Sequence, residues 1–362
     1  MIEAFVPEHI RSLTPYPPGK PLSELERELG VSKAIKLASN ENALGPSPKA
    51  MQAIQEALPD LHRYPDGGGF YLRDALSKHL GINGDQLVLG NGSNEIIELL
   101  LRTFLTTDSE VLTSETTFVV YRLITQAAGA HFVPVPMRDY GFDLNAIADR
   151  VTEKTRIIFL CNPNNPTGTM FSQSSLDRFL QRVGDDPILV LDEAYIEFVA
   201  PHDRIDAIEV LKRRPRTLIL RTFSKAYGLA GLRLGYGISS PDLADYMNRV
   251  RQPFNTNHLA QVAAKAALGD HDYLQRVLQL TEDGKRSISN QLREMGLSVV
   301  DSHTNFVLFD CGRDAKPIYE ALLQMGIIVR PMTAYGLPTH LRVNMGLPEE
   351  NERFLQGLRQ AL

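Results

Sequence analysis

The chain has 362 residues, 43% of them hydrophobic and 22% charged, a balance typical of a globular protein long enough for two domains. Its formal net charge of -5 at pH 7 argues against a nucleic-acid partner or an anionic membrane surface. No apolar run approaches the roughly 20 residues that span a bilayer, and the N-terminus lacks the pattern of a secretory signal. Cys161 and Cys311 stand apart with no CxxC spacing, so we expect no disulfide framework, no metal site and a cytoplasmic location.

The first residues of the chain are rich in proline over 13–21, and a short helical pattern follows over 22–29. A segment this short cannot form a core of its own. We therefore predict that residues 1–35 form an arm that lies across another surface.

The middle of the chain, from about 48 to 235, alternates strand-like apolar runs with helical patterns. The runs that we expect as strands are 86–89, 110–113, 156–160, 188–191, 217–220 and 233–236. Several are continuously apolar, as strands covered on both faces should be. The alternation predicts an α/β domain with a largely parallel sheet.

The last third of the chain has a different pattern. Helical segments cover about 258–295 and are followed by strand-like runs at 297–300, 304–309, 327–330 and 341–344. We predict a large domain over 36–255 and a smaller α+β domain over 256–362.

A lysine follows the apolar run 217–220, at the edge of the sheet where α/β proteins bind ligands. Burying the Lys225 ammonium costs several kcal/mol without a partner, whereas the neutral amine is the form that makes a Schiff base. Thr222, Ser224 and Arg233 lie in the same segment and supply donors for a phosphate. Together these residues predict a binding site for pyridoxal 5'-phosphate (PLP). The alternative is an ordinary loop with a surface lysine.

A glycine-rich turn follows the run 86–89 and precedes a helix. The backbone N–H groups of Ser93 and Asn94, with Gly92 before them, suit a phosphate at the N-terminus of that helix. The alternative is an ordinary helix start with Ser93 as the N-cap.

Polar and aromatic residues also follow the other strand-like runs. Asp192 can keep the pyridine nitrogen of PLP protonated, although it could also cap the next helix. Tyr195 and Asn165, the latter in a rigid turn with two Asn-Pro steps, can hydrogen-bond the phenolate oxygen of the cofactor. Phe118 can stack on the cofactor ring or pack in the core. Five strand ends thus present a phosphate site, an aromatic ring, an amide, an acid and a lysine, a combination that packing does not explain.

These motifs, with Lys36–Asn42, Arg63–Asp66 and Gly326–Pro331, resemble the fold-type I PLP enzymes over residues 13–347. The resemblance is to the class II aminotransferases and, among them, to the histidinol-phosphate aminotransferase branch. It implies a large domain with a mainly parallel seven-stranded sheet between helices. It also implies a homodimer with shared active sites, in which Tyr64 reaches the cofactor phosphate of the neighbouring subunit.

The resemblance further suggests where the substrate binds. It implies that Tyr16 closes over the substrate, that Asn40 contacts it, and that Arg342, with Arg330 as a second arginine, holds its anionic end. The chain departs from the branch at two positions. Asn94 stands where aspartate is common, and Phe118 stands where tyrosine is common, so ring stacking survives there but a hydroxyl contact does not.

The reaction implied by the resemblance is a ping-pong amino transfer between L-histidinol phosphate and 2-oxoglutarate in histidine biosynthesis, with Lys225 moving the proton. Three other interpretations stay open from the sequence. They are a broad-specificity aromatic amino-acid aminotransferase, a PLP-dependent phospho-amino-acid decarboxylase, and a binding module that has lost catalysis. The presence of Lys225, Asp192 and Arg233 together argues against the last one.

Overall fold

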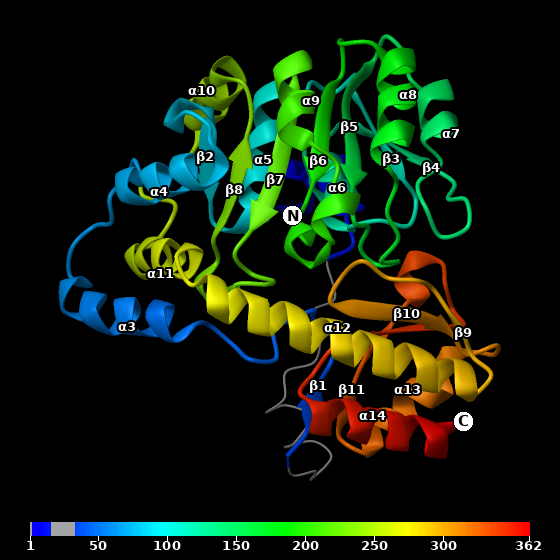
Figure 1. Cartoon of the computed structure of the whole chain (residues 1–362). Helices are drawn as coiled ribbons and strands as arrows, with labels where there is room; N and C mark the ends of the chain where they lie inside the picture. Colours follow the sequence, from blue (N-terminus) through cyan, green and yellow to red (C-terminus); the bar gives the residue numbers. More distant parts are fainter. Residues whose placement is uncertain (1, 16–32) are drawn as a thin grey trace.

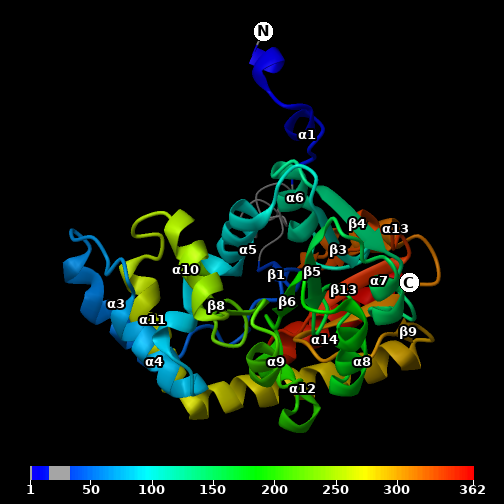
Figure 2. The same cartoon turned by 90° about the horizontal axis from the view of Figure 1, so that it is seen from above.

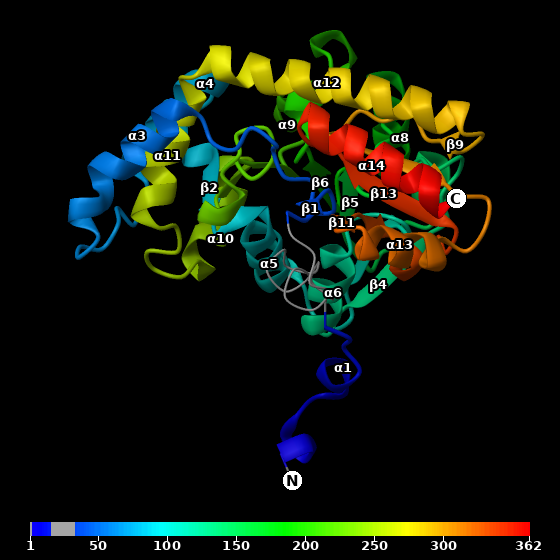
Figure 3. The same cartoon turned by 90° about the horizontal axis from the view of Figure 1, so that it is seen from below.

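The computed structural model of the chain describes residues 2–15 and 33–362. The helix predicted over 22–29 and Tyr16 lie outside the described residues. The first described segment, with helix α1 (Glu8–Arg11), projects away from the body of the molecule (Figures 2 and 3). It returns to the body at helix α6 (Val120–Ala127), where the Gln126 side chain donates to the His9 carbonyl oxygen over 3.3 Å.

A seven-stranded sheet forms the centre of the larger part of the molecule (Figure 1), in the order β2-β8-β7-β6-β5-β3-β4. Only β8 runs antiparallel to its neighbours, which confirms the prediction of a mainly parallel sheet. The strands are β2 (Leu87–Gly90), β3 (Glu110–Ser114), β4 (His131–Val135), β5 (Thr155–Cys161), β6 (Ile188–Asp192), β7 (Thr217–Thr222) and β8 (Gly235–Ile238).

Two strands of the seven-stranded sheet differ from the prediction. The edge strand β4 was not predicted. The strand predicted over 233–236 begins two residues later, at Gly235, because Arg233 has a φ of 58° and so cannot continue an extended strand.

Helices cover both faces of this sheet, as the continuously apolar strands require. Along β5, Ile157 and Phe159 pack on one side, whereas Ile158 and Leu160 pack on the other. The first side is covered by α6, α5 (Gly92–Phe104) and α10 (Pro241–Val250). The second is covered by α3 (Pro48–Ala57), α4 (Phe70–Leu80), α7 (Leu144–Asp149), α8 (Gln173–Val183), α9 (Ala207–Arg213) and α11 (His258–Leu268).

A smaller α+β unit follows, as predicted. The single strand predicted over 327–330 is divided at Val329 into two strands that belong to different sheets, and the strand over Ile35–Lys36 was not predicted. The four-stranded antiparallel sheet of this unit has the order β12-β13-β10-β9, and a separate parallel pair joins β1 to β11. The strands are β1 (Ile35–Lys36), β9 (Ser298–Val299), β10 (Phe306–Asp310), β11 (Ile327–Ile328), β12 (Arg330–Pro331) and β13 (His340–Asn344). The helices are α12 (His271–Glu294), α13 (Ala315–Gln324) and α14 (Pro348–Ala361).

The long helix α12 connects the two parts of the molecule (Figure 1). Leu274 near its start packs on the core of the large sheet, and Ile288 and Leu292 near its end belong to the core of the small one. The domain boundaries at 35/36 and 255/256 stay predictions. The apolar contacts favour placing α11 with the large sheet and β1 with the small one.

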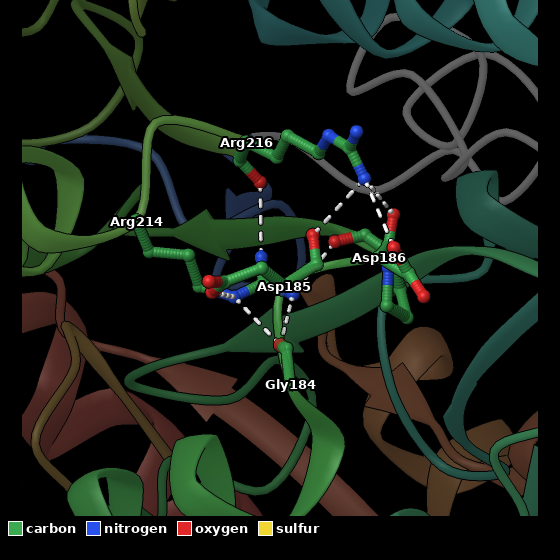
Figure 4. Close-up of polar contacts among 6 residues, drawn as sticks. Gly184, Asp185, Asp186, Arg214 and Arg216 are labelled. Atoms are coloured by element: carbon green, nitrogen blue, oxygen red, sulfur yellow. Dashed lines mark hydrogen bonds and ion pairs between the residues drawn. The ribbon is translucent and has the colours of Figure 1, made fainter.

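The amino ends of β6 and β7 are tied together by one arginine (Figure 4). The Arg214 side chain is 4% exposed and donates to the carbonyl oxygens of Gly184, Pro187 and Arg216 over 2.7–3.2 Å. These carbonyls lie in the turn before β6 and at the start of β7. Arg214 therefore fixes the register of the two strands whose other ends lead to Asp192 and Lys225.

Among residues 2–15 and 33–362, no helix has both the length and the apolarity to cross a membrane. The same residues contain no cluster of three or more side chains suited to hold a metal ion.

Candidate active site

The carboxyl ends of the parallel strands border a cavity of about 200 Å³. Every residue predicted to bind the cofactor lines this cavity, with the exception of Tyr64; Cys161 and Ala194 complete the lining. The predicted residues in the lining are Gly92, Ser93, Asn94, Phe118, Asn165, Asp192, Tyr195, Thr222, Ser224, Lys225 and Arg233. The individual roles assigned to them stay proposals.

One end of the cavity has the chemistry of a phosphate site. Helix α5 begins at Gly92 and carries no side-chain cap, so Ser93 lies within the helix and the interpretation of Ser93 as the N-cap is wrong. A Cβ atom on Gly92 would lie 2.5 Å from Nη2 of Arg233, so the close approach of the guanidinium requires glycine there. Nη1 of Arg233 lies 3.5 Å from Oγ of Ser224. Uncapped N–H groups, a guanidinium and a hydroxyl thus converge, and this set fits the phosphate of PLP.

Lys225 projects into the cavity and is partly buried. Its Nζ donates to the Ser39 carbonyl oxygen over 3.2 Å and lies 5.7 Å from the ring centroid of Tyr195. Burial, and then the positive charge of Arg342, lowers the Lys225 pKa to about 8. The neutral amine, which is the nucleophilic form, is therefore accessible near neutral pH. These contacts exclude the alternative of an ordinary surface lysine.

Asp192 ends β6 and is 2% exposed. Its Oδ2 accepts from the Tyr121 hydroxyl over 2.6 Å, and its Oδ1 accepts from the Ala194 N–H over 3.1 Å. Burial raises the Asp192 pKa to about 6, and the hydrogen bond from Tyr121 opposes that rise. Asp192 is not a helix cap, because the next helical turn begins at Ile196 with Tyr195 in the cap position.

Tyr121 is the residue that the sequence analysis missed. Its ring is fully buried and stacks on Phe159, with ring centroids 4.3 Å apart, so in the sequence it looks like any core aromatic of an amphipathic helix. The only available signal was its hydroxyl, which needs a partner when it is buried.

The remaining cofactor residues lie on the cavity walls. Phe118 is partly buried and packs edge-to-face on Tyr121, with ring centroids 5.5 Å apart. The Tyr195 hydroxyl accepts from Nδ2 of Asn40 over 2.8 Å, and burial raises the Tyr195 pKa. Oδ1 of Asn165 accepts from Nη1 of Arg342 over 2.5 Å. Side chains from the small sheet and from the segment after β1 thus reach the residues that line the cavity.

Arg330 and Arg342 are register partners across β12 and β13. Residues directly opposite in an antiparallel pair project on the same face, with Cβ atoms about 5 Å apart. The structure therefore brings the two predicted substrate arginines together, and it places Arg342 in contact with the cavity wall through Asn165.

Tyr64 lies outside the cavity. Its side chain is 83% exposed and stacks on Phe254, with ring centroids 4.8 Å apart. It borders a second hollow of about 690 Å³, together with Tyr71 and residues of α3 and α11.

Comparisons with known proteins agree with this geometry. Residues 32–358 match the family model for aminotransferase class I and II. A histidinol-phosphate aminotransferase of Pasteurella multocida is 48% identical, covering 99% of this chain and 98% of its own length. A histidinol-phosphate aminotransferase of Methylobacillus flagellatus is 50% identical, and the match covers 99% of this chain and 97% of that protein.

A solved structure extends the likeness to the fold. The histidinol-phosphate aminotransferase of Sinorhizobium meliloti, in complex with pyridoxal-5'-phosphate, has a TM-score of 0.90 at 31% identity and covers 98% of this chain and 96% of its own. This likeness confirms the fold-type I architecture expected from the sequence. The chain therefore belongs to the aminotransferase class I and II family, among the histidinol-phosphate aminotransferases.

Proposed function

We propose that this chain is a PLP-dependent aminotransferase that exchanges an amino group between L-histidinol phosphate and 2-oxoglutarate. The products are imidazole acetol phosphate and glutamate, and the reaction belongs to histidine biosynthesis. The observation that carries the proposal is the single cavity in which the phosphate site, Lys225 and Asp192 converge, with Arg342 bonded to one of its walls through Asn165.

Different lining residues bind different parts of the cofactor. The backbone N–H groups of Ser93 and Asn94 would bind the phosphate together with Thr222, Ser224 and Arg233, and Phe118 would pack on the ring. The N–H of Gly92 donates to the Arg233 carbonyl oxygen over 3.1 Å, so Gly92 contributes by making room for the Arg233 guanidinium. Asp192 pairs with the ring nitrogen, and Asn165 and Tyr195 hold the ring oxygen. The chemistry that PLP supplies when bound is an electron sink for the reacting carbon of the substrate.

Lys225 moves the proton at that carbon. A pKa of about 8 lets its amine both accept and release a proton near neutral pH, as general acid–base catalysis requires. Asp192, with a pKa of about 6, is ionised at neutral pH and balances the positive charge of the ring nitrogen.

Arg342 holds the anionic end of each substrate. One pocket must accept the phosphate monoester of histidinol phosphate and the carboxylate of glutamate, and the planar fork of arginine binds both. Arg330, beside Arg342, adds a second positive charge, which favours a dianionic phosphate over a carboxylate. Asn40, bonded to Tyr195, forms part of the same substrate region.

A second copy of the chain completes the site. The exposed surface around Tyr64 is apolar, since the side chains of Phe70 and Tyr71 are each 67% exposed and Phe254 is 46% exposed. Exposed apolar patches of this kind mark interaction surfaces. We propose a homodimer in which Tyr64 reaches the cofactor phosphate of the neighbouring subunit. A cytoplasmic location stays a prediction.

Hybrid dimers test this sharing of sites. Mixing inactive Lys225→Ala subunits with inactive Tyr64→Ala subunits should restore part of the activity, because one of the two hybrid sites has both residues intact. A fully active monomer in a sedimentation measurement would rule the shared site out.

The substrate is tested by half-reactions. The PLP-loaded enzyme is mixed separately with histidinol phosphate, phenylalanine, tyrosine, aspartate and a phospho-amino acid, and the change in its visible absorbance and any release of CO₂ are followed. We expect histidinol phosphate to react fastest. A preference for phenylalanine or tyrosine would indicate an aromatic aminotransferase, release of CO₂ from a phospho-amino acid would indicate a decarboxylase, and no reaction with any amine would indicate a binding module.

A further inference from the structure

Strand β13 has a row of polar side chains on the face that meets the large domain. His340, Arg342 and Asn344 alternate with Leu341 and Val343, so they project on the same face of the strand. The three polar residues are only 5%, 6% and 3% exposed. Buried polar groups of this kind need partners, and each of the three has one outside the small sheet.

The three partners come from three different segments. His340 Nε2 lies 2.9 Å from the Tyr140 hydroxyl, Arg342 Nη1 donates to Asn165 Oδ1 over 2.5 Å, and Asn344 Oδ1 accepts from the Asn40 N–H over 3.0 Å. The middle contact belongs to the arginine assigned to the substrate anion. The outer contacts therefore hold the strand that carries this arginine.

Tyr140 is presented to His340 by a tight turn between β4 and α7. Arg138 and Gly141 form a bridge that closes the turn, and Asp139 and Tyr140 between them have φ values of 50° and 60°. A left-handed conformation is unfavourable for tyrosine, which has no side-chain group that compensates locally. A two-residue turn of this kind requires a positive φ at both central positions, so the turn fixes the backbone from which the Tyr140 side chain reaches His340.

The same turn is bonded to the loop that carries Asn165. The Tyr140 carbonyl oxygen accepts from Oγ1 of Thr169 over 2.8 Å, and the Thr169 carbonyl accepts from the Asn164 N–H over 2.8 Å. A closed path therefore runs from Tyr140 through His340 and β13 to Arg342, and returns through Asn165 and its loop. The Arg342 guanidinium is held from both directions.

His340 is suited to accept the hydrogen bond from Tyr140. Its Nδ1 lies 3.0 Å from Oγ1 of Thr339 and 4.0 Å from Oδ1 of Asp310, its register partner on β10, so the ring proton belongs on Nδ1. Nε2 is then the acceptor for the Tyr140 hydroxyl. Burial lowers the His340 pKa and so favours the neutral ring, although the charge of Asp310 opposes this shift.

We infer that Tyr140 and His340 are positioning residues: their contact holds β13 against the large domain so that Arg342 is oriented for the anionic end of the substrate. This inference rests on the proposed function, in which Arg342 binds that anion. Neither residue touches the cofactor cavity, so their loss should weaken anion binding without weakening PLP binding.

The test measures the binding of two unreactive anions, glutarate and inorganic phosphate, to the PLP-loaded enzyme by calorimetry. Tyr140→Phe should raise both Kd values about 3- to 10-fold, the effect of one lost hydrogen bond. PLP affinity should not change, and KM for 2-oxoglutarate should rise more than kcat falls. The matched control is Tyr246→Phe, at an exposed tyrosine of α10, which should change none of these values.

Variants of His340 sharpen the test. His340→Leu should reproduce the loss of Tyr140→Phe, and His340→Gln, whose amide reaches about as far as Nε2, should retain most of the affinity. The double variant Tyr140→Phe/His340→Leu should bind no more weakly than the worse single variant, since both remove the same contact. Tyr140→Gly, which removes the ring and suits the positive φ, should fold and show the same weakening even if Tyr140→Phe does not fold.

Unchanged Kd values in Tyr140→Phe or Tyr140→Gly would overturn the inference, and so would an equal effect in Tyr246→Phe or additive losses in the double variant. Anion binding does not depend on turnover. The wild-type enzyme could fail to react with histidinol phosphate while the Tyr140 and His340 variants still show the expected increases in Kd. That result would refute the proposed substrate and leave the positioning role intact.

Discussion

The two edges of the large sheet both bury charged side chains, but they satisfy them differently. At the amino edge, Arg214 donates to three backbone carbonyls that belong to the fold itself, and its Nε lies 3.6 Å from the carboxylate of exposed Asp185 (Figure 4). At the carboxyl edge, Lys225 has one backbone partner and Asp192 depends on one tyrosine hydroxyl and one N–H, and both border a cavity. Burial moves the pKa of each of these two groups toward neutrality.

This difference separates a stabilising charge from a functional one. A buried charge whose partners are main-chain atoms of neighbouring strands holds those strands together. A buried charge that faces a cavity costs stability until a ligand arrives, and the same desolvation gives it a useful pKa. The two edges should therefore respond in opposite ways to substitution, and four experiments test that contrast.

The largest effect is expected at Lys225. Lys225→Ala should abolish transamination, because no other group at the reacting carbon can replace the amine as nucleophile and proton carrier. The free energy of unfolding of the apo-enzyme should stay the same or rise, since a desolvated amine is removed. Half-reaction rates and thermal unfolding together measure this, and appreciable turnover in the variant would contradict the assignment.

Asp192→Asn should slow the half-reaction by on the order of 10²-fold, as expected for a lost electrostatic contact at a catalytic site. The substitution should also raise the free energy of unfolding of the apo-enzyme at neutral pH, whereas loss of a structural charge lowers it. Burial raises the pKa of Asp192 from 3.8 to about 6 in the folded chain, so the fold binds the proton more tightly than the unfolded chain does. Wild-type apo-enzyme should therefore lose up to about 3 kcal/mol relative to Asp192→Asn as the pH rises from about 4 to 6. Parallel stability curves for the two proteins over this range would disprove the shift.

At the amino edge, Arg214→Met should lower the free energy of unfolding by roughly 2–4 kcal/mol, because it removes the hydrogen bonds of the guanidinium and leaves the carbonyl oxygen of buried Pro187 without its donor. The kcat/KM of the folded enzyme should be nearly unchanged. Arg216→Met is the matched control, since the Arg216 side chain is 58% exposed and its ion pair with Asp186 lies in solvent. That control should cost less than about 1 kcal/mol. Equal denaturation midpoints for the two variants would remove the distinction between the edges.

The contrast between the edges also explains what the sequence allowed us to predict. The strand ends were recognisable because polar residues at or soon after the end of an apolar run are a local signal. Asp192 comes directly after the run 188–191, and Lys225 lies five residues after the run 217–220. Strand β4 was missed because it is an edge strand that begins at His131 and whose apolar run is interrupted by Pro134. The pairs Tyr121–Asp192 and Tyr140–His340 join residues 71 and 200 positions apart, so only the folded chain reveals them.

The smallest effect is expected at Tyr121, which shares features of both edges: it is fully buried, and its hydroxyl supports a cavity carboxylate. The hydrogen bond favours the ionised form of Asp192, so Tyr121→Phe should raise the Asp192 pKa above its value of about 6. A lost hydrogen bond to a charged group corresponds to about one pKa unit. If PLP binds best when this carboxylate is ionised, the pH midpoint for PLP binding by the apo-enzyme should move upward by that amount. Tyr246→Phe should leave the midpoint in place, and an unmoved midpoint in Tyr121→Phe would mean that Tyr121 is a core aromatic and nothing more.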